Sequence, residues 1–112
     1  NGGFASALTG YVGYAASAAN NGFEVLSGGT LDLEVAVIGN TNSLSNYLLV
    51  DGANATFSAT ELTIGLQSQS NALIVSNGAQ ASSGNTFIGV STNGNYNRLV
   101  GGRVRCVLEK EI

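Results

Sequence analysis

The sequence predicts an all-β protein built as a parallel β-solenoid, in which the chain winds through about four stacked coils of roughly 25 residues each. Three observations support this prediction: a repeat of nearly constant period, an alternation of apolar and polar residues with a period of two, and glycines at the same place in every unit. A single coil cannot bury its apolar face alone. Stacked coils share one core and pair their backbones at a spacing of about 4.8 Å.

Two independent sets of residues mark the repeat. The first set consists of asparagines that precede an alternating apolar segment, spaced 25, 25 and 26 residues apart: Asn21, Asn46, Asn71 and Asn97. The second set consists of glycines that follow Val or Ile, spaced 26, 26 and 24 residues apart: Gly13, Gly39, Gly65 and Gly89. Because both sets keep the same period over four units, the repeat is interpreted as a structural unit.

Each unit is predicted to contain three short strands joined by turns. The first strand holds the alternating pair after the asparagine, for example Leu48 and Val50. A glycine-bearing turn leads to a second strand with small inward residues such as Ala53 and Ala55, and the third strand ends at Ile64. The polar stretch before the next asparagine varies in length, which is typical of a loop.

Stacking of the coils explains why the asparagines and the glycines recur at equivalent positions. Equivalent side chains lie directly above one another in a solenoid, so the four asparagines are expected to form a ladder of amide hydrogen bonds in a turn. Glycine adopts positive φ without a steric penalty, so the four glycines are expected at the corners of the coils.

The pattern Asn-x-Leu-x-Val, then Gly-Ala, then Ile-Gly and a polar Asn/Ser loop resembles the repeats of bacterial autotransporter passenger domains and of related repeat-rich cell-surface proteins. The resemblance covers roughly residues 5–100. It implies a right-handed β-helix, an extracellular or cell-surface location, and an adhesive or structural role. The sequence departs from that family because it contains no translocating barrel and fewer coils than a typical passenger domain.

The repeat divides the chain into three parts. Residues 20–100 hold the regular units, residues 1–19 form an N-terminal cap or a degenerate first coil, and residues 101–112 form a C-terminal capping strand. The Ala-rich stretch 4–19 suits either a capping helix or a first strand. The alignment of Gly13 with the other glycine landmarks favours the strand.

The two ends differ in charge. Six of the 11 charged residues lie between Arg98 and Glu111, which suits a strand protected against edge pairing, a charged docking surface, or a tail foreign to the repeat. Residues 1–23 carry no charge, and an unprotected strand edge recruits other chains. We therefore expect a homo-oligomer or a filament formed by end-to-end stacking. The residues expected at this contact are Phe4, Leu8, Val104, Cys106 and Leu108.

The composition argues against several classes of function. Four basic residues and a net charge of −3 do not suit a groove that follows nucleic-acid phosphates. No run of 18 apolar residues predicts a membrane span. The lone Cys106 excludes an internal disulfide and a Cys-based zinc site, and the lack of His excludes Ser-His-Asp and Cys-His catalysis. We expect no cofactor and no enzymatic activity.

Two features leave other functions open. Asp32 and Glu34 lie two residues apart, so both project from one face of a strand, and such a pair could serve a glycosidase or bind calcium. The favoured interpretation is that the pair forms the solvated face of a strand whose inward residues are Leu31, Leu33 and Val35. The polar loops after Gly39, Gly65 and Gly89 are expected on one edge, where they could bind a glycan or another surface ligand.

Overall fold

The computed structural model describes residues 3–14, 18–89, 96–101 and 104–111. These residues form nine β-strands and no helix. In chain order the strands are β1 (Phe4–Val12), β2 (Gly22–Val25), β3 (Thr30–Ile38), β4 (Tyr47–Asp51), β5 (Thr56–Ile64), β6 (Ala72–Ser76), β7 (Gln80–Ile88), β8 (Arg98–Gly101) and β9 (Val104–Glu111).

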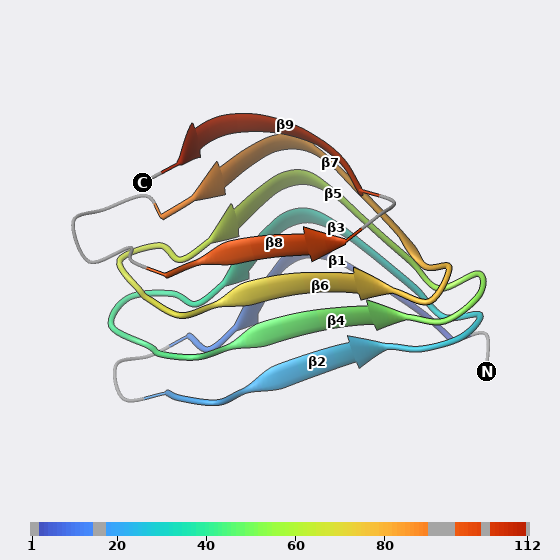
Figure 1. The fold of residues 1–112 in the computed structure, drawn as a ribbon, viewed down its shortest axis with the longest axis horizontal. Coiled ribbons are helices and arrows are strands. Elements are labelled where there is room, and N and C mark those ends of the chain that lie inside the picture. Colours follow the sequence, from blue (N-terminus) through green and yellow to red (C-terminus); the bar gives the residue numbers. More distant parts are fainter. Residues whose placement is uncertain (1–2, 15–17, 90–95, 102–103, 112) are drawn as a thin grey trace.

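The strands form two parallel sheets on opposite sides of one core (Figure 1). The long strands make the five-stranded sheet β1-β3-β5-β7-β9, and the short strands make the four-stranded sheet β2-β4-β6-β8. Each short strand and the long strand after it form one coil, and the coils stack on β1. In Figure 1 the nearer short strands run left to right and the long strands behind them run right to left as the chain rises. This confirms a right-handed parallel β-solenoid.

Each coil contains two strands where the sequence predicted three. The predicted second and third strands are one nine-residue strand with a bend, as Thr56–Ile64 shows. At the bend two consecutive residues, Thr60 and Glu61, lie outside the core, and the buried positions resume at Leu62. The polar pair therefore makes a corner within a strand, and it resembles a turn when only the sequence is considered.

Columns of aliphatic side chains fill the core. Leu48 pairs in register with Leu73, and Val50 pairs with Val75, so like side chains stack along the short-strand sheet. All four are buried. The long strands add a column that ends each coil before its glycine: Ile38, Ile64 and Ile88. These columns explain why the period is so constant, because an inserted residue would turn the following side chains out of the core.

One column of the long sheet combines large and small side chains. Phe57 is the largest fully buried side chain, and its register neighbours are Leu31 and Ala81. Ala55 is also fully buried, whereas Ala53 is exposed in the turn before β5. Only one residue of that predicted inward pair therefore belongs to the core.

Both ends of the stack are strands. Phe4–Val12 pairs with β3 and is not a capping helix, although all nine of its residues are exposed or only partly buried. At the other end, Val104–Glu111 pairs with β7 with shifts in register along Ser83–Phe87. Each sheet therefore ends in a strand that pairs on one side only within the described ranges.

Candidate assembly site

The four landmark asparagines form a hydrogen-bonded ladder along one corner of the solenoid. The Oδ1 atom of Asn71 accepts bonds from the backbone N and the Nδ2 of Asn46, at 2.9 and 3.1 Å. Asn46 accepts the same two bonds from Asn21, and Asn97 accepts them from Asn71. The amide oxygens of Asn46, Asn71 and Asn97 thus each receive two donors from the coil on their N-terminal side.

The ladder includes buried serines that sequence reasoning missed. Ser43 and Ser68 are 0% and 1% exposed, and their hydroxyl oxygens lie 3.2 Å apart. The Nδ2 of Asn71 donates to the Ser68 hydroxyl at 2.8 Å, and the Ser43 hydroxyl donates to the Asn40 carbonyl at 2.6 Å. Every buried side-chain polar atom in the described residues has a partner. The repeated spacing Ser-x-x-Asn, with Asn46 and Asn71, was the available signal.

The glycine landmarks lie against the asparagine landmarks. Gly39 has φ +84°, and a Cβ at this position would overlap the carboxamide of Asn71. Gly13 and Asn46 form the same relationship, as do Gly65 and Asn97. The fourth glycine, Gly89, also has a positive φ. The two sets of landmarks are therefore two sides of one corner.

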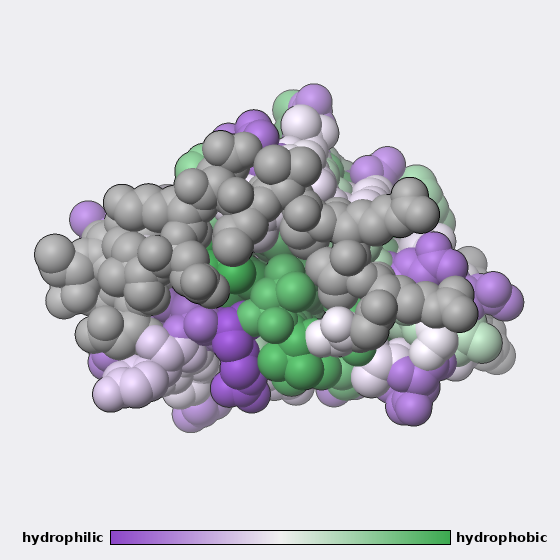
Figure 2. All heavy atoms as spheres, turned by 45° about the horizontal axis from the view of Figure 1, so that its top comes forward, coloured by the Kyte–Doolittle hydropathy of each residue, from purple (hydrophilic) through white to green (hydrophobic). Residues whose placement is uncertain are grey.

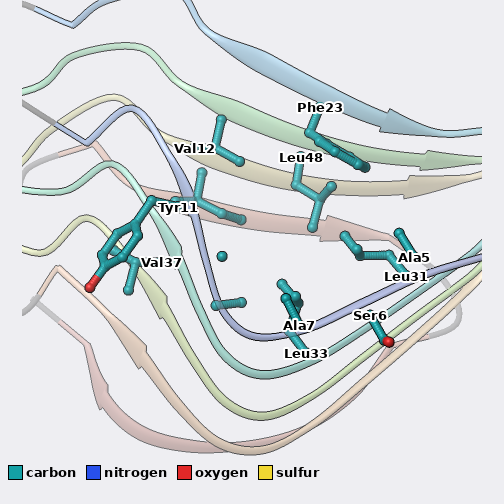
Figure 3. A pocket seen from close by; sticks show the side chains of 13 residues that line it. Ala5, Ser6, Ala7, Tyr11, Val12, Phe23, Leu31, Leu33, Val37 and Leu48 are labelled. Atoms are coloured by element: carbon teal, nitrogen blue, oxygen red, sulfur yellow. The ribbon is translucent and has the colours of Figure 1, made fainter.

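The N-terminal end of the stack opens onto the apolar core. An opening of about 240 Å³ lies between β1 and β2, and it is lined almost entirely by apolar side chains (Figure 3). Phe23 and Leu48 line it from the short-strand sheet, while Ala5, Ala7 and Leu33 line it from the long-strand sheet. The opening exists because no described strand covers the edge of β2.

Phe4 and Leu8 lie beside this opening and do not line it. Their side chains are 68% and 72% exposed. They alternate with Ala5 and Ala7 along β1, which places them on the outer face of the sheet. Phe4 lines a neighbouring hollow of about 390 Å³ together with Phe23.

The three predicted C-terminal contact residues lie on β9, the last strand of the long sheet. Val104 is in register with Ala81, Cys106 with Ser83, and Leu108 with Thr86. The partner positions Ala81, Ser83 and Thr86 are all buried. The structure therefore places the two groups of predicted contact residues at opposite ends of the long sheet. The extents of the molecule are 37 × 26 × 24 Å.

Asp32 and Glu34 lie apart from this site. Asp32 and Glu34 are exposed on β3, and Asp32 accepts a hydrogen bond of 2.9 Å from Ser58. The part of the chain that the structure describes holds no group of three or more His, Cys, Asp or Glu residues able to bind a metal ion. The pair occupies a solvated strand face, as favoured from the sequence.

Asp51 accepts two side-chain hydrogen bonds from the next coil. Ser76 donates to its Oδ1 at 2.6 Å and Asn77 donates to the same atom at 2.7 Å. These hydrogen bonds lower the pKa of the Asp51 carboxyl, with the Ser76 bond as the larger cause, because both stabilise the charged form.

The polar loops form a second, more hydrophilic surface. A groove of about 200 Å³ runs between the loops after Gly39 and Gly65. The third loop, residues 90–95, lies outside the described residues. The lining residues are Asn42, Ser43, Leu44, Gln67, Ser68 and Gln69.

The outer face of the short-strand sheet is partly apolar. Leu49, Ile74 and Val100 stack in register there, and Val100 is 45% exposed. Figure 2 shows hydrophobic residues gathered in the middle of the face that it views, with hydrophilic residues on either side. Contacts along the side of the solenoid therefore have an apolar surface to use.

Within the described ranges, no helix has the length and hydrophobicity that crossing a membrane requires. Comparisons of the chain with protein-family models, with curated proteins and with solved structures found no match.

Proposed function

We propose that this chain is a non-catalytic, extracellular structural or adhesive β-solenoid whose copies stack end to end into filaments. The observation that carries the proposal is the open N-terminal end, where the strand edges of β1 and β2 border an apolar opening of about 240 Å³. Exposed apolar surface at an unprotected strand edge favours the addition of further strands.

The long sheet provides the geometry for stacking. If β9 of one copy pairs with β1 of the next, the register places Val104 beside Ala5, Cys106 beside Ala7, and Leu108 beside Gly10. Such a contact joins two different surfaces and does not close, so it produces a filament. Each copy contributes five long strands, which gives an axial repeat of about 24 Å at the usual strand spacing.

The proposed location rests on the resemblance of the repeat to cell-surface repeat proteins. The structural role is supported by the ordered stack itself. The same coil geometry repeats along the axis, so one coil can act as the template for the next. The last strand carries charged residues, which disfavour the addition of a further strand. The neutral N-terminal edge is therefore the end at which strand addition is more favoured.

A matched pair of variants tests the stacking. Ala7→Asp places a carboxylate at the opening, whereas Thr9→Asp places the same charge on an exposed residue of the same strand that does not line the opening. Electron microscopy of the concentrated wild-type protein is expected to show filaments with a repeat of about 24 Å. The Thr9 variant should keep them and the Ala7 variant should lose them. Wild-type protein that remains a monodisperse monomer at high concentration contradicts the proposal.

A second candidate function is binding of carbohydrate or another surface ligand by the polar loops. The groove lined by Gln67 and Gln69 favours it, because amide and hydroxyl groups suit sugar hydroxyls. Glycan-array binding that is lost when residues 67–70 or 91–95 are replaced would support this candidate. Filaments that persist after the same replacements would support the structural role.

A further inference from the structure

At the N-terminal end of the described residues the two sheets differ by one strand. The long sheet has five strands and the short sheet has four, so no described short strand lies beside β1. The opening occupies that place, bordered by Phe23 and Leu48 on one side and by Ala5 and Ala7 on the other (Figure 3). Stacking of β9 on β1 extends the long sheet only, so it leaves this place vacant in the short sheet.

The existing columns specify what fits the vacancy. A strand added to the free edge of β2 in the same parallel register places one residue beside Phe23 and another beside Val25. In the coils above, these two columns continue as Leu48 and Val50. The vacancy therefore suits an apolar residue at the first position and Val, two residues later, at the second.

The asparagine ladder adds a polar requirement. The Oδ1 atoms of Asn46, Asn71 and Asn97 each accept two bonds from the preceding coil. None of the described residues donates to the Oδ1 of Asn21, which lies next to β2 at the open end. An asparagine two residues before the first apolar position supplies the missing backbone N–H and Nδ2 donors.

We propose that the N-terminal end is a strand-acceptor site that binds an extended Asn-x-Leu-x-Val segment from another polypeptide carrying this repeat. The segment adds to β2 as a parallel strand, with main-chain hydrogen bonds giving affinity and the two apolar positions giving specificity. The site deepens the proposed function and rests on the same open end, but it uses the short sheet where filament stacking uses the long one.

Charge specifies one further position. The residue between the two apolar positions lies outward and beside Glu24, whose side chain is exposed. Opposite charges on neighbouring strands attract, so Lys at this position is expected to bind up to about fivefold more tightly than Glu. Replacing Glu24 with Lys should reverse that preference.

The probe is the peptide SNALIVS, which has the sequence of residues 70–76. It is titrated into the dilute, isotope-labelled full chain, and binding is followed by NMR. Shift changes are expected at the amides of Gly22–Val25 and in the opening. Peptides with Asn replaced by Ala, or with Leu replaced by Asp, should bind at least about tenfold more weakly because a buried polar or apolar contact is lost. The peptide pair SNALKVS and SNALEVS tests the charge preference.

Three results would overturn the site: no shifts at millimolar peptide, shifts confined to β8 and β9, or equal binding of the Asn→Ala peptide. Peptide binding at β2 without filaments at high concentration supports the site and contradicts the proposed stacking. Filaments without peptide binding do the reverse. The two proposals therefore fail separately.

Discussion

Gly39 and Asn71 pack so closely that a Cβ on the glycine would overlap the carboxamide of the asparagine. The two residues belong to successive coils and are 32 positions apart in the chain. The glycine adopts a φ of +84°, which an L side chain disfavours, and the space that it leaves receives the asparagine that holds the ladder. One corner thus depends on both landmarks together.

Replacing Gly39 with Ala is expected to destabilise the fold by more than replacing Gly78 with Ala. Both glycines have positive φ, so both variants bear a backbone cost of about 1–2 kcal/mol. Only Gly39 adds the overlap with Asn71, since the nearest atom to a Cβ on Gly78 is 3.7 Å away. The overlap adds about 1–3 kcal/mol. Urea unfolding of the two variants measures the difference, and equal losses would show that the overlap is relieved without cost.

Asn71→Ala is expected to cost about 1–3 kcal/mol because it leaves buried donors of Asn46 without an acceptor. Asn21→Ala should cost less, since Asn21 is exposed and no described residue donates to its side-chain oxygen. Thermal unfolding of the two variants checks this order. A larger loss for Asn21→Ala would mean that the ladder contributes little to the interior coils.

Ser83 and Thr86 form a buried pair of hydroxyl groups joined by a hydrogen bond inside the apolar core. Thr86→Val leaves the Ser83 hydroxyl without this partner and should cost about 1–3 kcal/mol. The double variant Ser83→Ala/Thr86→Val removes both hydroxyls and should recover part of that loss. Unfolding free energies of the single and double variants test this coupling. Additive losses would contradict it.

Stability is expected to fall in acid through Asp51. Its pKa is lowered in the folded state, so the carboxylate stabilises the fold above the pKa of the unfolded chain, and this contribution is lost as the pH falls through the folded pKa. Asp51→Asn keeps an acceptor for Ser76 but cannot titrate. The gap in melting temperature between wild type and Asp51→Asn should therefore narrow below about pH 4. A gap that stays constant from pH 7 to pH 3 would assign the acid sensitivity to other carboxyls.

The period of the sequence was enough to predict the stacked coils. Leu48, Leu73, Val50 and Val75 recur 25 residues apart, and a fold that stacks each coil on the last turns this period into columns. The division of a coil into strands was less predictable. Each unit was predicted to contain a second and a third strand, whereas Thr56–Ile64 is one strand in which Thr60 and Glu61 lie at a bend.

For the candidate site as well, some features were predictable from the sequence and others were not. The neutral N-terminal segment led us to expect a contact at this end through Phe4 and Leu8, but their outward direction on β1 could not be read without the register to β3. The opening itself depends on five long strands facing four short ones. No local pattern in the sequence encodes that difference in number.

The sequence by itself determined the repeat, the parallel stacking and the residues of the corners, because each follows from a local period that stacking makes self-consistent. Tertiary structure alone decided that Gly39 meets Asn71, that Ser43 and Ser68 join the ladder, and that no described strand pairs with the outer edge of β2. These features depend on which side chains meet across coils and on which edge remains uncovered. Such relationships arise only when successive coils of the chain stack on one another.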